Sequence, residues 1–218
     1  MLFRSGVREG LDGNVDLVIP DKFVSEGTEY DIVSITSMGK QKTHSISLTG
    51  IKLELKGFFG AFNGSDTESV FLENVESVTK LSFFGATFSN HFYNSTTKTV
   101  TIRDSSLGNY DFKNCRNLVS ASVSGGDIPE SMFEGCEKLS GVALTNVDKI
   151  GAGAFSGCTS LGAIDLSGVR CVGDRAFTKT GIEELTVPSS VEEMSFSNGD
   201  GTICQRSEER RVGKECRS

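Results

Sequence analysis

Four consecutive stretches of this chain share one pattern: YDFKNCRNLVSASVSG over residues 110–125, SMFEGCEKLSGVALTN over 131–146, GAFSGCTSLGAIDLSG over 153–168 and RAFTKTGIEELTVPSS over 175–190. When they are aligned, apolar residues fall into shared columns at a period of 21–22 residues. The columns contain Phe112, Phe133, Phe155 and Phe177; Leu118, Leu139, Leu161 and Ile182; Ala121, Val142, Ile164 and Leu185; and Val123, Leu144, Leu166 and Val187. Self-similarity at a fixed period of this length predicts a solenoid of stacked repeats.

Each repeat contains a strand signal, because apolar and polar residues alternate around its last two columns. A strand that recurs this often leaves no room for a long crossover helix, so we expect the strands to stack as one parallel sheet on a concave face. The preceding A-F-x-x-C segment predicts a short helical or 3-10 turn on the convex side, with its Phe in the core. The expected strand centres are 46–48, 70–72, 100–102, 121–123, 142–144, 164–166 and 185–187.

The repeat pattern also predicts the organisation of the chain. Regular repeats cover 107–194, degenerate turns of 21–24 residues cover 36–106, and an initial hairpin covers 15–35. A longer interval contains LSFFGATFSNHFYNSTTK, residues 81–98, which we expect to bulge from the stack as a loop. Because the repeats are continuous, we predict a single domain over residues 6–205.

Neither terminus fits the repeat. RSEERRVGKECRS at 206–218 and LFRS at 2–5 back-translate to the two ends of a common sequencing adapter. We interpret residues 1–5 and 206–218 as adapter-derived scars. On this interpretation the tail packs against nothing, and truncation after Gln205 leaves the melting temperature unchanged. The alternative is a solvated basic extension.

The repeats resemble the BspA-type leucine-rich repeat, whose units read approximately I-x-x-x-A-F-x-x-C-x-x-L-x-x-I-x-L-P. Residues 150–191 follow this pattern closely, and the resemblance is strong over 107–194 but weak over 15–106. Ordinary leucine-rich repeats carry Asn or Cys just beyond the strand, whereas here Cys lies three positions before the first Leu of the strand. The resemblance implies a cell-surface or secreted protein that binds host or microbial proteins, as an adhesin does, and implies no catalysis.

Three cysteines, Cys115, Cys136 and Cys158, occupy one repeat column. Cys behaves as a small hydrophobe in a core, so we favour buried free thiols. Adjacent turns also lie close enough for a disulfide to be an alternative. A metal site has the least support, because the chain has no C-x-x-C pair and only two histidines, His44 and His91.

The sequence contains no recognisable catalytic constellation. His44 and His91 both lie in degenerate turns without a fixed Ser or Cys partner, so we predict a non-enzymatic protein without cofactors. A net charge of −7 argues against nucleic acid or anionic lipid as a partner. No apolar run is long enough to predict a membrane span within the chain.

The expected outer face of the sheet is small, flat and polar, which suits an extended protein partner. Its central row contains Ser47, Phe71, Thr101, Ser122, Ala143, Asp165 and Thr186. We predict the partner-binding site at Phe71, Glu73 and Arg103, because exposed aromatic and Arg side chains dominate protein interfaces. Two alternatives remain at this point. The Ser and Thr residues are ordinary solvent-exposed strand residues that bind no partner, or the array is a structural spacer that carries another domain.

Overall fold

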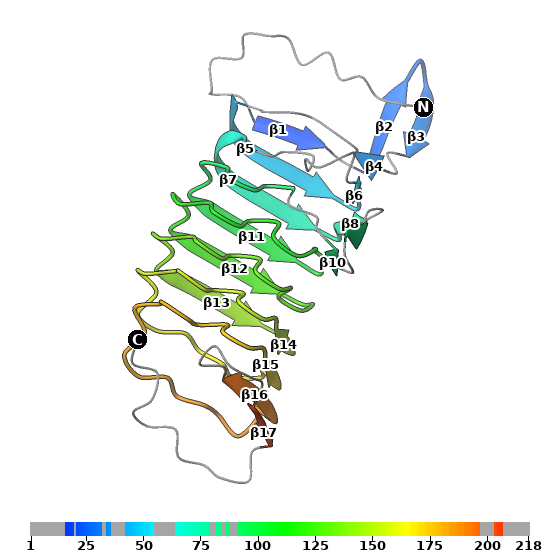
Figure 1. Cartoon of the computed structure of the whole chain (residues 1–218). Coiled ribbons are helices and arrows are strands. Elements are labelled where there is room, and N and C mark those ends of the chain that lie inside the picture. The colour runs from blue at the N-terminus through cyan, green and yellow to red at the C-terminus, as the bar shows by residue number, and fades with distance from the viewer. Residues whose placement is uncertain are drawn as a thin grey trace.

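Stacked turns of similar shape make up most of the described structure (Figure 1). The structure, a computed structural model, describes residues 16–19, 21–31, 34–35, 42–54, 64–78, 82–83, 86–87, 91–196 and 203–206. Its main sheet contains, in spatial order, β1 (Asp16–Ile19), β5 (Lys42–Thr49), β7 (Asp66–Glu73), β11 (Thr99–Arg103), β12 (Ser120–Ser124) and β13 (Gly141–Thr145). All neighbouring strands in this sheet are parallel, which confirms the predicted solenoid.

The main sheet has the pairing register that the repeat columns predict. Ser47 pairs with Phe71, Phe71 with Thr101, and this row continues through Ser122 to Ala143. The alternate residues of each strand point inward, and Ile46, Leu48, Val70, Leu72, Val100, Ile102, Ala121 and Val123 are buried. β1 extends the same sheet by one strand at its edge, a position that the sequence did not predict.

The last two predicted strands, at 164–166 and 185–187, are wrong, since neither segment joins the sheet. In the first, the Asp165 carboxylate accepts hydrogen bonds from the backbone N–H and the hydroxyl of Ser167, at 2.9 and 2.6 Å. This local turn competes with pairing between strands. In the second segment, Pro188 directly follows the predicted strand and has no N–H to donate to a neighbouring strand.

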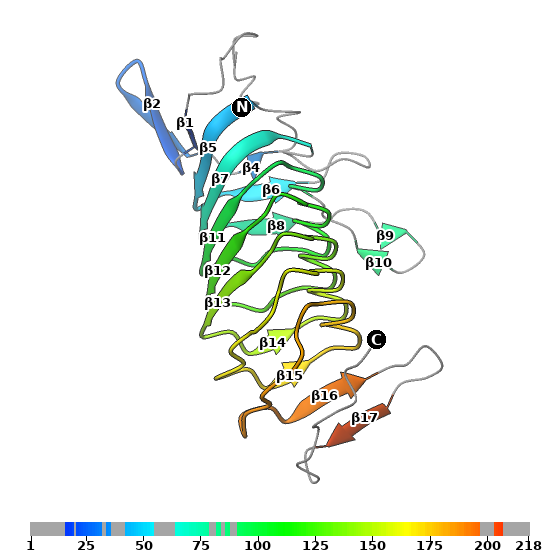
Figure 2. The ribbon, with the colours of Figure 1, turned by 90° about the vertical axis from the view of Figure 1, so that its left-hand side faces the viewer.

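A second set of short strands lines the flank of the stack (Figure 2). Its first part orders β4 (Ser34–Ile35), β6 (Lys52–Glu54) and β8 (Glu76–Val78), and its second part orders β14 (Lys149–Ile150), β15 (Cys171–Val172), β16 (Glu193–Phe196) and β17 (Ile203–Arg206). Pairing is parallel except between β16 and β17. The predicted boundary after Gln205 therefore falls inside a strand, and Arg206 has regular structure, while residues 207–218 lie outside the described residues.

The side opposite the main sheet has no helix in the described parts of the chain, so the predicted helical or 3-10 turns are wrong. Two residues per turn have positive φ instead, for example Tyr110 at 67° with Asn114 at 59°, and Gly153 at 62° with Gly157 at 76°. A residue whose backbone adopts the left-handed conformation cannot continue a right-handed helix. Alternate N–H groups in these segments donate to the next turn, as Phe155 N–H does to the Ala176 carbonyl 2.9 Å away.

The aromatic column forms a continuous stack through the core. Adjacent ring centroids from Phe112 through Phe133 and Phe155 to Phe177 lie 5.5–5.8 Å apart, and all these rings except Phe177 are fully buried. Phe92 extends the stack by one ring, at 4.8 Å from Phe112. The predicted loop at 81–98 is thus only partly correct: β9 (Ser82–Phe83) and β10 (Ala86–Thr87) form a small antiparallel pair, but residues 91–98 belong to a solenoid turn.

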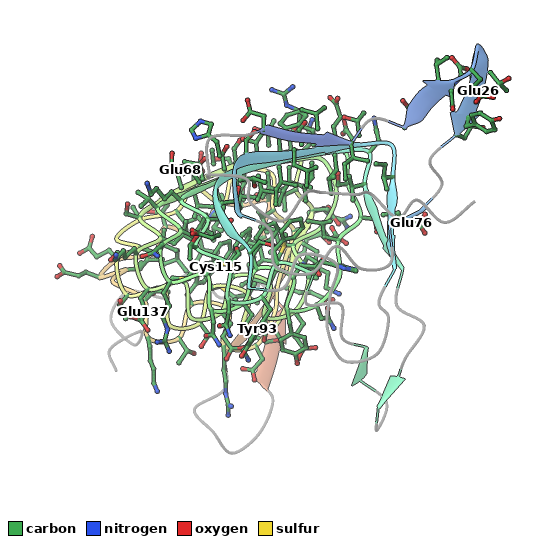
Figure 3. All side chains as sticks on the ribbon, turned by 90° about the horizontal axis from the view of Figure 1, so that it is seen from above. Glu26, Glu68, Glu76, Tyr93, Cys115 and Glu137 are labelled. Atoms are coloured by element: carbon green, nitrogen blue, oxygen red, sulfur yellow. The ribbon has the colours of Figure 1, made fainter. Side chains whose placement is uncertain are left out.

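The repeat cysteines are free, buried thiols in the interior of the stack; Figure 3 shows Cys115 inside and Glu137 on the outer surface. Cys115, Cys136 and Cys158 each donate an S–H to a Phe carbonyl of the preceding turn, all at 3.2 Å. Each thiol therefore has an apolar environment and a hydrogen-bond acceptor that joins two turns. Neither a disulfide nor a metal is needed to explain the column.

Stability should fall at high pH because the Cys158 thiol is buried. Burial raises the pKa of Cys158 from 9.0 to about 12. The folded-state pKa lies above the unfolded value, so this stabilisation is complete below pH 9 and is lost as the pH rises toward 12. Denaturant midpoints of the wild type and Cys158→Ala should differ by a constant amount below pH 8, and that difference should narrow above pH 9. A difference that stays constant to about pH 11 would contradict the buried neutral thiol.

At the N-terminal end, β2 (Lys22–Ser25) and β3 (Thr28–Asp31) form an antiparallel hairpin that projects from the stack (Figure 1). Its two-residue turn has Glu26 and Gly27 at φ values of 51° and 78°. Positive φ at both positions matches the right-handed twist of the flanking strands. The Lys22 ammonium lies 2.8 Å from the Glu29 carboxylate across the hairpin.

Candidate functional site

The outer face of the main sheet presents three parallel rows of side chains. The rows contain Ser45, Ser69, Thr99, Ser120 and Gly141; Ser47, Phe71, Thr101, Ser122 and Ala143; and Thr49, Glu73, Arg103, Ser124 and Thr145. Alternation along each strand places these residues outside and the apolar residues inside. The face is therefore flat and mostly hydroxylated, with one aromatic ring on it.

The structure brings the predicted site residues together on the outer face. Phe71 and Glu73 are half-buried on β7, and Arg103 is exposed on β11. The Arg103 guanidinium carbon lies 5.3 Å from the centroid of the Phe71 ring, a cation–π distance. Glu73 is the register partner of Arg103. An apolar ring, a cation and a carboxylate thus occupy adjacent positions.

Charged residues border this face where the strands begin. The Glu68 carboxylate lies 2.7 Å from the Lys98 ammonium and 3.4 Å from Nδ1 of His44. The hydrogen bond from Lys98, followed by its positive charge, lowers the pKa of Glu68. This carboxylate stays ionised at neutral pH, and the cluster joins three adjacent turns.

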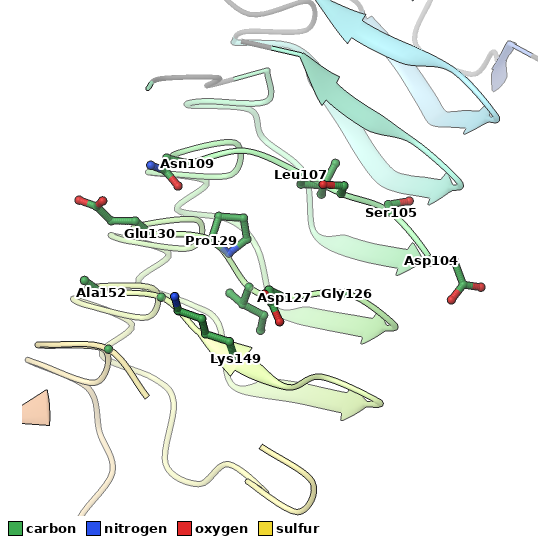
Figure 4. Close-up of a pocket in the computed structure, with 14 residues that line it drawn as sticks. Asp104, Ser105, Leu107, Asn109, Gly126, Asp127, Pro129, Glu130, Lys149 and Ala152 are labelled. Atoms are coloured by element: carbon green, nitrogen blue, oxygen red, sulfur yellow. The ribbon is translucent and has the colours of Figure 1, made fainter. Parts of the chain in front are cut away.

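A second concave feature lies on the flank of the stack, where sequence reasoning placed no site (Figure 4). It is a groove of about 920 Å³. Its walls come from four successive turns: Asp104–Leu107 and Asn109, Gly126–Glu130, Lys149 with Gly151 and Ala152, and Gly173. Pro129 is one of its lining residues, but the repeat columns of the sequence do not indicate a groove there.

The two histidines lie in different environments. His44 is exposed beside Glu68, whereas His91 is buried. Among the residues that the structure describes, no three His, Cys, Asp or Glu side chains are placed to hold a metal ion. The described part of the chain also contains no helix with the length and apolarity to cross a membrane.

Solved structures similar to this chain include other leucine-rich repeat proteins. One from T. pallidum is 22% identical, covering 48% of this chain and 54% of that one, with a TM-score of 0.43. One from Bacteroides ovatus is 22% identical, covering 86% and 55%, with a TM-score of 0.49. The pneumococcal vaccine antigen PcpA is 15% identical, covering 87% and 44%, with a TM-score of 0.49. The chain thus spans about half the length of the structures it matches.

No curated protein matches the chain. A family model does: the BspA-type leucine-rich repeat region matches in six copies over residues 86–199, more than half of the chain. Leucine-rich repeat families are generally non-enzymatic and act as protein-interaction modules. With its repeat columns, parallel sheet and stacked Phe residues, this chain belongs to the BspA-type leucine-rich repeat family.

Proposed function

We propose that this chain is a recognition module that binds an extracellular protein through the outer face of its main sheet, centred on Phe71, Glu73 and Arg103. The observation that carries the proposal is the Arg103 guanidinium over the Phe71 ring, at 5.3 Å. Aromatic and Arg side chains supply most of the binding energy in protein interfaces. The cation is held against the ring before a partner arrives, so less side-chain entropy is lost on binding.

The surrounding rows support the same proposal. Serine, threonine, glycine and alanine occupy most positions on the face, and their short side chains let a partner approach the sheet closely. The Phe71 ring supplies an apolar anchor, while Arg103 and Glu73 supply charges that orient the partner. An adhesin-like role on a cell surface or after secretion fits the family assignment.

A structural spacer is the second candidate, and contacts between turns favour it. Ion pairs join adjacent turns at several places, including Lys113 to Glu134 at 2.9 Å and Arg170 to Glu192 at 2.8 Å. Such contacts, repeated along a solenoid, stiffen the stack between its ends. A spacer would need no partner on the sheet face.

The triple variant Phe71→Ser, Glu73→Ser, Arg103→Ser should abolish partner capture while the fold stays intact. Partners are captured on the immobilised wild-type chain from host-surface and extracellular-matrix extracts and identified, and their affinities are then measured with purified proteins. Loss of an aromatic hot spot costs about 2 kcal/mol or more, which weakens binding about thirtyfold.

The matched control is Val119→Ser, which removes an apolar side chain that is 45% exposed but lies outside the three rows. The control should bind like the wild type. Undiminished capture by the triple variant would move the site elsewhere, and the segment 83–98 would be the next candidate. Failure of the wild type to capture any partner would favour the spacer.

A further inference from the structure

The main sheet can be laid face to face on a second copy of itself about one two-fold axis. Its strand order is β1, β5, β7, β11, β12 and β13, so the midline of the sheet runs between β7 and β11 (Figure 1). An axis above this midline and parallel to the strands sets β7 of one copy opposite β11 of the other, β5 opposite β12, and β1 opposite β13. The strands of the two sheets then stay nearly aligned, as in ordinary packing of sheet on sheet.

Opposite charges meet at the centre of this arrangement. Glu73 and Arg103 are register partners on β7 and β11, so the axis sets each of them opposite the other residue of the second copy. Among the described residues, neither side chain forms an ion pair. Both charges therefore remain available to a partner, and the symmetry forms two ion pairs at once.

Side-chain sizes are also complementary along the central row. Register places Val18 of β1 at the start of this row, before Ser47, and its side chain is 62% exposed. The two-fold axis sets Val18 opposite Ala143, and it sets Phe71 opposite Thr101. Each larger apolar side chain thus meets a short one, which lets the two sheets approach each other.

We propose that the sheet face binds a second copy of this chain about this two-fold axis. The inference rests on the proposed function, because it names the partner of the same site. A symmetric dimer requires a surface that is complementary to itself, and the charges and side-chain sizes of this face meet that requirement.

The area of the face sets the strength of the dimer. Six strands at about 4.8 Å and five residues at about 3.3 Å give a face of about 30 by 16 Å. Two such faces bury about 1,000 Å² together, which is below the size of standard protein interfaces. We therefore expect a weak, reversible dimer.

Sedimentation velocity of the full chain, from about 1 μM to 1 mM, measures this association. The wild type should shift from monomer to dimer over this range. Glu73→Arg and Arg103→Glu each set like charges opposite each other twice, so each variant should weaken self-association at least about tenfold.

An equimolar mixture of these two variants should dimerise again. The new arginine of one variant meets the new glutamate of the other, and the native Arg103 of the first meets the native Glu73 of the second. Affinity in the mixture should return to within about threefold of the wild type. Each substitution shifts the net charge of −7 by two units, so both variants stay acidic and non-specific attraction does not explain the rescue.

Two further variants test the extent and the location of the contact. Ala143→Arg sets a long cation against Val18 of the second copy, three strands away from Phe71, and should weaken the dimer about tenfold. Arg116→Glu is the matched control, because it makes the same charge change as Arg103→Glu at an exposed side chain outside the three rows. It should leave the affinity within about twofold of the wild type.

Several results would overturn the inference. A wild type that stays monomeric at the highest concentration would exclude the second copy as partner, and the proposed function would then stand or fall on capture from extracts. No dimer in the mixture, or no effect of Ala143→Arg, would exclude this two-fold axis. Equal losses in Arg116→Glu and Arg103→Glu would mean a general effect of charge. Rescue in the mixture also shows that both variants fold, and Ala143→Arg keeps the test open if one of them does not.

Discussion

Replacing Phe155 by alanine should lower the free energy of unfolding by about 3–5 kcal/mol, the cost of truncating a fully buried aromatic side chain. The Phe155 ring is completely buried and lies between two rings of the stack, 5.5 Å from Phe133 and 5.8 Å from Phe177. Its removal therefore leaves a cavity with aromatic walls in two neighbouring turns. Coupling between repeats should spread the loss to both turns.

Urea denaturation followed by circular dichroism measures this loss. Phe177→Ala is the matched control, because Phe177 is the last ring of the stack among the described residues and is only partly buried, so its truncation should cost clearly less. A denaturation midpoint for Phe155→Ala equal to that of the wild type would mean that the Phe column carries little packing energy.

Gly151→Ala should also destabilise the chain strongly, by about 1–3 kcal/mol. A Cβ on Gly151 would lie 2.5 Å from the backbone nitrogen of Glu130 and 2.6 Å from the carbonyl carbon of Pro129. These atoms belong to the backbone of the preceding turn, so they cannot rotate away as a side chain would. The turns must separate to accommodate the methyl group, and the hydrogen bond of Gly151 N–H to Ile128 is disturbed.

Gly162→Ala is the control, because a Cβ at Gly162 would meet no atom within 4 Å. Thermal melts of both variants should show a lower melting temperature for Gly151→Ala only. Equal melting temperatures for the two variants would contradict the close approach of adjacent turns at Gly151.

The sequence predicts the register of the main sheet because each strand repeats its pattern at a spacing that the solenoid geometry imposes. The columns of Val100 and Ala121 pair in the structure as aligned. The repeat alignment does not include Phe92, because its turn has Ser95 at the position where the other turns have the repeat Cys. The Ser95 hydroxyl nevertheless lies 3.2 Å from Cys115 Sγ, so a polar group can extend the thiol column.

The errors arise where backbone conformation, and not side-chain pattern, decides the structure. The A-F-x-x-C spacing is compatible with a helix, but alternate N–H groups donate to the next turn, and no helix forms in the described residues. Single non-glycine residues at positive φ, such as Tyr110 and Ser131, carry no strong sequence signal.

For the candidate site, the sequence predicts that the three residues lie close together, but it does not predict the contacts between their side chains. Two-residue alternation places Phe71 and Glu73 on the outer face, and the repeat places Arg103 beside them. The cation–π contact between Arg103 and Phe71 depends on side-chain rotamers, which a repeat alignment does not determine.

Hydroxyl-radical footprinting of the chain, alone and in complex with a captured partner, tests most directly whether the sheet face binds protein. The Phe71 ring is partly exposed and reacts readily, whereas a partner seated on the face would shield it. Oxidation of Phe71 should fall several-fold in the complex, while oxidation of Val119, exposed outside the three rows, should not change. Undiminished oxidation of Phe71 in a saturated complex would contradict the proposed binding surface.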